Sequence, residues 1–197
     1  MEEGNKMMQV LAFNGSPRKK GNTEILLEAM GHGIKSAGGD LEIIRLCDMS
    51  ISPCIGCGSC GKKGKCIIDD DMTLLYEKIG AHKRIVLASP IYFYGITSQA
   101  KAFVDRIQAL WSRKYLLDNG IGKNQTGRKG YLVSVAATKG ERVFEGAELT
   151  ASYFFDAIDA VFSGSLLVRG MDNRGAVSDA QDEIGKAEKF GRDIVQI

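Results

Sequence analysis

Apolar runs alternate with segments of helical periodicity along the chain. Near-continuous apolar runs such as 7–13 and 84–89 are typical of strands buried on both faces. Leu26, Leu27, Met30 and Ile34 share one face of a predicted helix. This alternation predicts a parallel sheet covered by helices on both faces. We expect strands at 7–13, 41–46, 84–89, 130–137 and 164–168, and helices at 23–37, 70–79, 97–110, 144–160 and 178–195.

The 197 residues suit a single α/β domain spanning residues 1–197. Five strands in this rhythm favour the flavodoxin-like three-layer sandwich with strand order 2-1-3-4-5, although that order is a prior of the fold class and is not written in individual residues. In such sheets the ligand binds beyond the carboxyl ends of the strands. The functional loops should therefore follow the first, third and fourth strands. Residues 120–127 form the most loop-like stretch.

Charge and hydropathy exclude several classes of function. The net charge of +2 indicates neither nucleic-acid nor membrane binding. No apolar run approaches the length of a membrane span, and the first residues lack the features of a signal peptide. We therefore expect a cytoplasmic protein, in which clustered cysteines bind metal or perform redox chemistry more often than they form disulfides.

Residues 14–23 join the first strand to its helix and carry many polar groups. Ser16, Asn22 and Thr23 offer hydrogen bonds, Arg18 adds positive charge, and the loop ends at a helix N-terminus that attracts anions. Five residues separate its two glycines and Asn22 follows the second, so the loop is neither a P-loop nor a dinucleotide fingerprint. It predicts a site for a single phosphate.

The loop after the third strand contains three consecutive aromatic residues, Tyr92, Phe93 and Tyr94. Regular alternation at a strand end would expose at least one of them, so they are poor core residues. They could instead stack against a flat ring. The loop therefore predicts a wall for an aromatic ligand.

Four of the five cysteines lie within thirteen residues in the pattern C-x2-C-x2-C-x5-C, at Cys54, Cys57, Cys60 and Cys66. A [4Fe–4S] cluster is the first interpretation, and four glycines give this segment the backbone freedom to wrap one. Ferredoxins share the start of the pattern but continue with x3-C-P. Redox-active thiols without a cluster are the second interpretation, and structural zinc, which usually takes two separate C-x-x-C hairpins, is the third.

The loop Gly-Ser-Pro-Arg-x-x-Gly-Asn-Thr resembles the FMN phosphate loop of the NADPH-dependent FMN reductase family. With the cysteine segment 54–66, nearly the whole chain resembles the iron–sulfur flavoproteins of that group in particular. The resemblance implies an FMN phosphate site at Ser16, Arg18, Asn22 and Thr23. It implies a cradle for the isoalloxazine at Pro90, Ile91, Tyr92, Phe93, Tyr94 and Gly95. It also implies a third flavin loop at Ala137, Thr138, Lys139 and Gly140.

The resemblance further implies an FMN-dependent oxidoreductase that passes electrons between a nicotinamide or ferredoxin-like donor and an acceptor through FMN and a [4Fe–4S] cluster. It also implies a homodimer or homotetramer. No catalytic side chain is predicted, because the flavin itself performs hydride transfer. The alternative is a cluster-free NAD(P)H-dependent FMN or quinone reductase with redox thiols. A flavodoxin-like electron shuttle and a zinc-stabilised binding module are rivals from other classes.

Overall fold

The computed structural model describes residues 7–121 and 127–196. Its strands form one parallel sheet in the order β2-β1-β3-β4-β5, so the predicted flavodoxin-like order is confirmed. The three central strands are almost wholly buried, as their apolar sequences require. The strands are β1 (Met8–Asn14), β2 (Gly39–Arg45), β3 (Arg84–Pro90), β4 (Lys129–Ala136) and β5 (Val161–Arg169).

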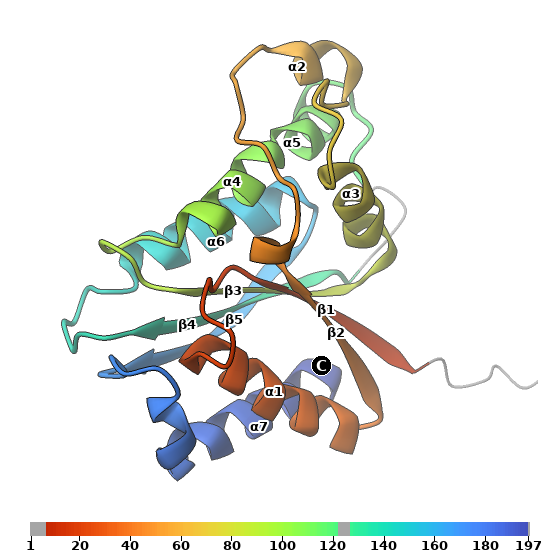
Figure 1. Cartoon of the computed structure of the whole chain (residues 1–197). Coiled ribbons are helices and arrows are strands. Elements are labelled where there is room, and N and C mark those ends of the chain that lie inside the picture. The colour runs from red at the N-terminus through yellow and green to blue at the C-terminus, as the bar shows by residue number, and fades with distance from the viewer. Residues whose placement is uncertain (1–6, 122–126, 197) are drawn as a thin grey trace, which may run out of the picture.

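Helices cover both faces of this sheet and complete a three-layer sandwich (Figure 1). One face is covered by α1 (Asn22–Ser36) and α7 (Gln181–Gln196). The other is covered by α3 (Met72–Ala81), α4 (Ser98–Arg106), α5 (Gln108–Tyr115) and α6 (Glu145–Ala157). Three short helices lie in the connections, namely η1 (Leu46–Asp48), α2 (Ser59–Lys63) and η2 (Ala176–Asp179). Across the described ranges, no helix combines the length and the apolar character needed to cross a membrane.

The predicted helix at 97–110 is divided in the structure, with α4 and α5 meeting at Ile107. The hydroxyl of Tyr76 donates to the carbonyl oxygen of Arg106 at 2.7 Å. The amide of Leu110, which would donate to that oxygen in a continuous helix, donates to Ile107 instead. A side chain inserted into the helical ladder therefore accounts for the break.

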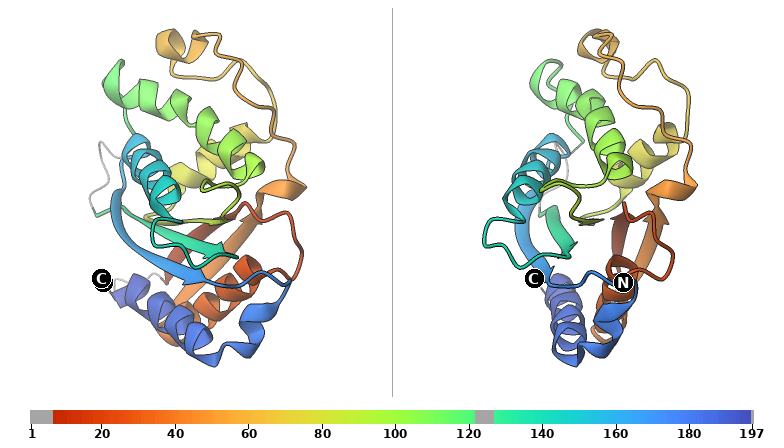
Figure 2. Two further views of the ribbon diagram at one scale, coloured as in Figure 1. Left: turned by 90° about the vertical axis from the view of Figure 1, so that its left-hand side faces the viewer. Right: turned by 60° about the vertical axis from the view of Figure 1, so that its left-hand side comes forward.

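Two other elements differ from the sequence prediction. Strand β5 begins at Val161 rather than at 164, because an irregularity opposite Gly130 and Tyr131 extends the pairing past a bulge. The cysteine segment contains the short helix α2, which stands clear of the sheet and packs beside α5 (Figure 2). Of the loop predicted at 120–127, residues 122–126 lie outside the described part of the chain.

Candidate functional site

A pocket opens where the carboxyl ends of the strands meet, as expected for a parallel α/β sheet. It gathers residues from the loops after β1, β3 and β4 and also from the loop after β5. Among the predicted residues it is lined by Ser16, Arg18, Asn22, Thr23, Pro90, Ile91, Tyr92 and Ala137. The structure thus brings the predicted phosphate loop and the first half of the aromatic loop to one place.

The phosphate loop has the features of an anion site. No side chain caps the N-terminus of α1, so its first-turn amides keep no side-chain acceptor. Ser16 is buried and its amide donates to Oδ1 of Asn14 at 2.9 Å. The Nδ2 atom of Asn14 is buried and has no hydrogen-bond partner within the described residues. A helix N-terminus whose first-turn amides carry no side-chain cap fits a phosphate group.

Asn22 lies in this pocket, but its side chain serves another purpose. Its Nδ2 donates to the carbonyl oxygens of Met171 and Asn173 at 3.1 and 2.9 Å, and its Oδ1 accepts from the amide of Val177 at 3.1 Å. These bonds tie the start of α1 to the loop after β5. Any contact of Asn22 with a phosphate would therefore come from its backbone amide.

Buried hydroxyls join strand β4 to the loops after β3 and β1. Ser134 on β4 donates to the carbonyl oxygen of Ser89 at 2.8 Å. The Ser89 hydroxyl accepts from the amide of Thr97, whose own hydroxyl donates to the carbonyl oxygen of Gly15 at 2.7 Å. The Thr97 hydroxyl also accepts from the amide of Ala100 and so caps α4. This chain of bonds fixes strand β4 and the loops after β1 and β3 relative to one another.

The aromatic loop has a strained, well-defined turn at its tip. Phe93 and Tyr94 adopt positive φ angles of 49° and 62°, which non-glycine residues rarely do. Two hydrogen bonds between Tyr92 and Gly95 close the turn. Phe93 is fully exposed, while Tyr92 lines the pocket. The turn holds Phe93, Tyr94 and Gly95 at the rim rather than among the residues that line the pocket.

The third predicted loop is only partly at the pocket. Ala137 lines it, whereas Thr138, Lys139 and Gly140 are exposed outside its lining. The structure adds Met171 and Asp172, from the loop after β5, which sequence reasoning missed. Gly170 directly precedes these two residues, but a single glycine is a weak signal, and only the position of their loop after a strand could have indicated them.

The four clustered cysteines surround a second pocket of about 250 Å³ beside α5. Cys54 and Cys57 are exposed, while Cys60 and Cys66 are partly buried, and none is in a disulfide. The rest of the lining is largely apolar, including Ile55, Ile67 and Leu116. Gly56, Gly58 and Gly64 take positive φ angles that let the segment curl around this space.

Within the ranges 7–121 and 127–196, no three histidine, cysteine or acidic side chains are grouped closely enough to hold a metal ion. Tetrahedral zinc would require all four sulfurs within about 2.3 Å of one point. The four cysteines line one pocket, and four thiolates are the ligand set that a [4Fe–4S] cluster takes.

The fifth cysteine, Cys47, belongs to neither pocket lining. Its Sγ donates to the carbonyl oxygen of Ser16 at 3.4 Å. Burial raises the pKa of its thiol, an effect that the nearby Arg45 only partly opposes. Cys47 is therefore a protonated thiol, and its hydrogen bond to the carbonyl oxygen of Ser16 supports the predicted phosphate loop.

The fold and the first pocket define a flavodoxin-like α/β domain with a pocket at the carboxyl ends of its strands. The sequence profile of the NADPH-dependent FMN reductase family matches residues 8–154. The chain belongs to this family, as its phosphate loop predicted.

The comparison with curated proteins agrees with the cysteine motif. An iron–sulfur flavoprotein of Methanocaldococcus jannaschii is 40% identical over 103 residues, which cover 52% of this chain and 53% of that protein. An iron–sulfur flavoprotein of Methanosarcina thermophila is 34% identical over 115 residues, covering 58% of this chain and 60% of that protein. The chain spans about half the length of the curated relatives it matches.

Solved structures support the fold. The NAD(P)H:quinone oxidoreductase from Methanothermobacter marburgensis superposes with a TM-score of 0.69 at 17% identity, covering 95% of this chain and 99% of that one. At that identity the similarity establishes the architecture alone.

Proposed function

We propose that the protein is an FMN-dependent oxidoreductase that also carries a [4Fe–4S] cluster on Cys54, Cys57, Cys60 and Cys66. One observation carries the proposal: four free cysteines surround a single pocket in a chain of the FMN reductase family. The names of the similar iron–sulfur flavoproteins support the same assignment.

The first pocket would hold FMN. Ser16, Arg18, Thr23 and the α1 N-terminus would bind its phosphate, and Tyr92 and the backbone of 90–95 would contact its ring. Bound FMN would supply hydride and electron transfer, so the protein's part is to bind and orient it. The hydroxyl chain through Ser89 and Thr97 keeps the ring-binding and phosphate-binding loops in register.

The second pocket would hold the cluster, with three apolar side chains limiting the access of water. A centre that moves single electrons beside a flavin that moves pairs suits exchange between a nicotinamide and a ferredoxin-like carrier. Exposed Cys54 and Cys57 favour the second candidate, a cluster-free NAD(P)H-dependent FMN or quinone reductase whose thiols react directly.

We also propose that the protein works in the cytoplasm as a homodimer or homotetramer. Leu149 and Tyr153 of α6 are exposed and, with Trp111 of α5, line an open groove that a second copy could cover. Sedimentation at several concentrations measures this state, and a monomer at all of them contradicts it.

Anaerobic purification followed by an absorption spectrum and assays of iron, sulfide and zinc tests the proposal. We expect flavin bands from FMN, together with a broad brown shoulder in the visible range and about four irons per chain from one cubane cluster. Flavin without iron, even after reconstitution with ferrous iron and sulfide, favours the thiol-bearing reductase. Zinc without flavin contradicts both candidates.

A further inference from the structure

The cysteine segment is anchored at few points, although it would have to hold four thiols in fixed positions. Residues 52–58 are exposed without interruption, and α2 contacts mainly α5. At the far end, Arg113 donates to the carbonyl oxygen of Gly64 at 2.6 Å. The segment therefore needs a further anchor at its two ends, where the chain leaves the sandwich and returns to it.

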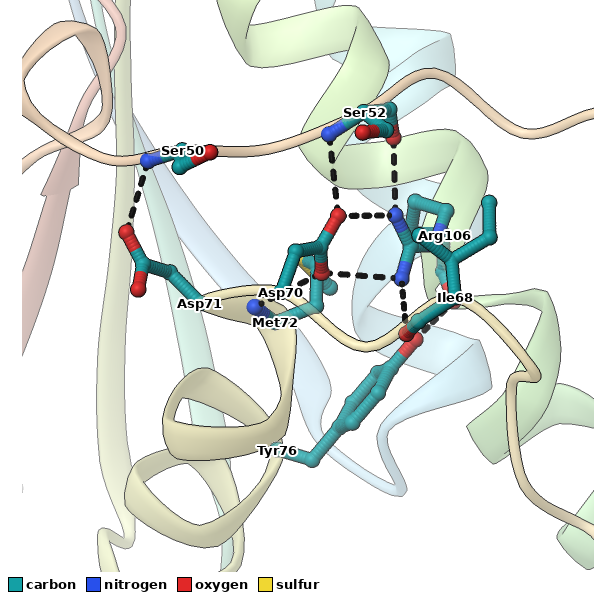
Figure 3. A network of polar contacts seen from close by, with 8 residues as sticks. All are labelled: Ser50, Ser52, Ile68, Asp70, Asp71, Met72, Tyr76 and Arg106. Carbon is teal, nitrogen blue, oxygen red and sulfur yellow. Dashed lines mark hydrogen bonds and ion pairs between the residues drawn. The ribbon is translucent and has the colours of Figure 1, made fainter.

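That anchor is a buried ion pair between Asp70 and Arg106. The side chains are only 6% and 1% exposed, and the guanidinium meets the carboxylate through two nitrogens, at 2.7 and 3.0 Å. Paired N–H donors on one carboxylate fix both its position and its orientation. Figure 3 shows the pair lying between the two chain segments that lead to the cysteines.

The same pair holds both of those segments. Nη1 of Arg106 donates to the carbonyl oxygen of Ser52 at 2.8 Å, and Nη2 donates to that of Ile68 at 3.3 Å. The carboxylate of Asp70 also accepts from the amide of Ser52 at 2.9 Å. Ser52 stands two residues before Cys54, and Ile68 stands two residues after Cys66. The guanidinium thus joins the two ends of the cysteine segment, next to a second link in which Ser50 and Asp71 exchange two hydrogen bonds (Figure 3).

Both members of the ion pair are held in place by further hydrogen bonds from α3. The Tyr76 hydroxyl donates to the Arg106 carbonyl oxygen, and the amide of Met72 donates to Asp70 at 3.1 Å. The pair therefore connects the end of α4 and the start of α3 to the two ends of the segment. Closing the loop in the folded protein removes chain freedom that would otherwise oppose gathering four thiols.

We propose that Asp70 and Arg106 are positioning residues for the four-cysteine centre, because they fix both ends of the segment that carries it. The inference rests on the proposed cluster. The two residues do not bind the metal. They act on the ligands through Ser52 and Ile68, as outer-shell groups act on metal sites in general.

The test compares Arg106→Lys and Asp70→Asn with a matched control, Arg128→Lys. Arg128 is also buried, but it donates to the carbonyl oxygens of Ile79 and His82, away from the cysteine segment. Each protein is reconstituted anaerobically with ferrous iron and sulfide. Iron and FMN per chain, the thermal midpoint and the rate of iron release to a chelator are then measured.

We expect the two variants of the pair to release iron about tenfold faster than the wild type and to keep their FMN. Arg128→Lys should retain wild-type iron release even where its thermal midpoint falls as far. If Arg106→Lys and Asp70→Asn both release iron at the wild-type rate, or if Arg128→Lys releases it equally fast, the positioning role is wrong. A wild-type protein that takes up no iron overturns the proposed cluster, and the positioning role with it.

Discussion

Thr97 shows how one side chain supports both the fold and the site. Its hydroxyl donates to the carbonyl oxygen of Gly15 and accepts from the amide of Ala100, and its own amide is held by Ser89. The residue is fully buried, so none of these groups would find water if the hydroxyl were lost. Thr97 therefore connects the start of α4 to the phosphate loop.

We expect Thr97→Val to lower the free energy of unfolding by about 1–2 kcal/mol, as for the loss of a helix cap. It should also weaken FMN retention, because Gly15 precedes the residues that we propose bind the FMN phosphate. Chemical denaturation and flavin fluorescence titration measure the two effects. Ser98→Ala is the control, since Ser98 is exposed and its hydroxyl donates to the side chain of its neighbour Gln99. Equal behaviour of the two variants would contradict the role of Thr97.

Asn22 gives a second expectation at this scale. Its side chain holds the loop containing Met171, so Asn22→Ala should weaken FMN binding by releasing that loop. Asn22→Asp keeps the acceptor for Val177 but loses the two amide donations and adds a negative charge, so it should weaken FMN binding at least as much. Titration of the apoprotein with FMN measures both. Undiminished binding in both variants would contradict the role of the Asn22 side chain in holding this loop for the flavin.

At the scale of elements, α1 and α7 pack with their backbones in close approach. A Cβ atom added at Gly191 would lie 2.0 Å from the carbonyl oxygen of Met30, and one added at Gly33 would lie 1.9 Å from that of Glu188. Backbone atoms cannot give way as a flexible side chain can. The two glycines therefore set the distance between the helices that cover one face of the sheet.

Gly191→Ala should destabilise the protein by about 1–3 kcal/mol, because the helices must separate. Gly185→Ala lies in the same helix, is exposed and meets no atom within 4 Å. It should stabilise the protein by up to about 1 kcal/mol through helix propensity. Thermal unfolding measures the stability of the two variants. If both variants change the stability in the same direction, α1 and α7 pack less closely at Gly191 than described.

The elements also show what sequence could and could not predict. Apolar runs located every strand, and the strand order came from the fold class; both are confirmed. The break between α4 and α5 could not be predicted, because it depends on Tyr76, a residue on another helix. Met171 and Asp172 were missed for a similar reason, since only the assembled sheet brings their loop to the first pocket. The binding of FMN at this pocket, and of a cluster at the other, stays a prediction.

At the scale of the whole molecule, the two pockets are separate. They share no lining residue, since one lies at the carboxyl ends of the strands and the other beside α5. None of the four cysteines belongs to either hydrophobic core beside the sheet. The cysteine segment therefore contributes little to the stability of the sandwich.

We accordingly expect Cys57→Ser to abolish the cluster while leaving FMN content and the thermal midpoint of the apoprotein close to those of the wild type. Iron analysis, flavin absorbance and calorimetry measure these quantities. Ser59→Ala, in the same segment, should keep both cofactors. Loss of flavin from Cys57→Ser would show that the two pockets are coupled.

The joining of Ser52 and Ile68 at one guanidinium has a consequence for how such a chain can vary over evolution. Everything between them leaves the sandwich and returns to nearly the same point. A shorter link between these two residues would keep the sheet, its helices and the first pocket intact. We therefore expect that the segment can be gained, lost or exchanged as a unit, together with the cluster that we propose it carries, without a change of fold.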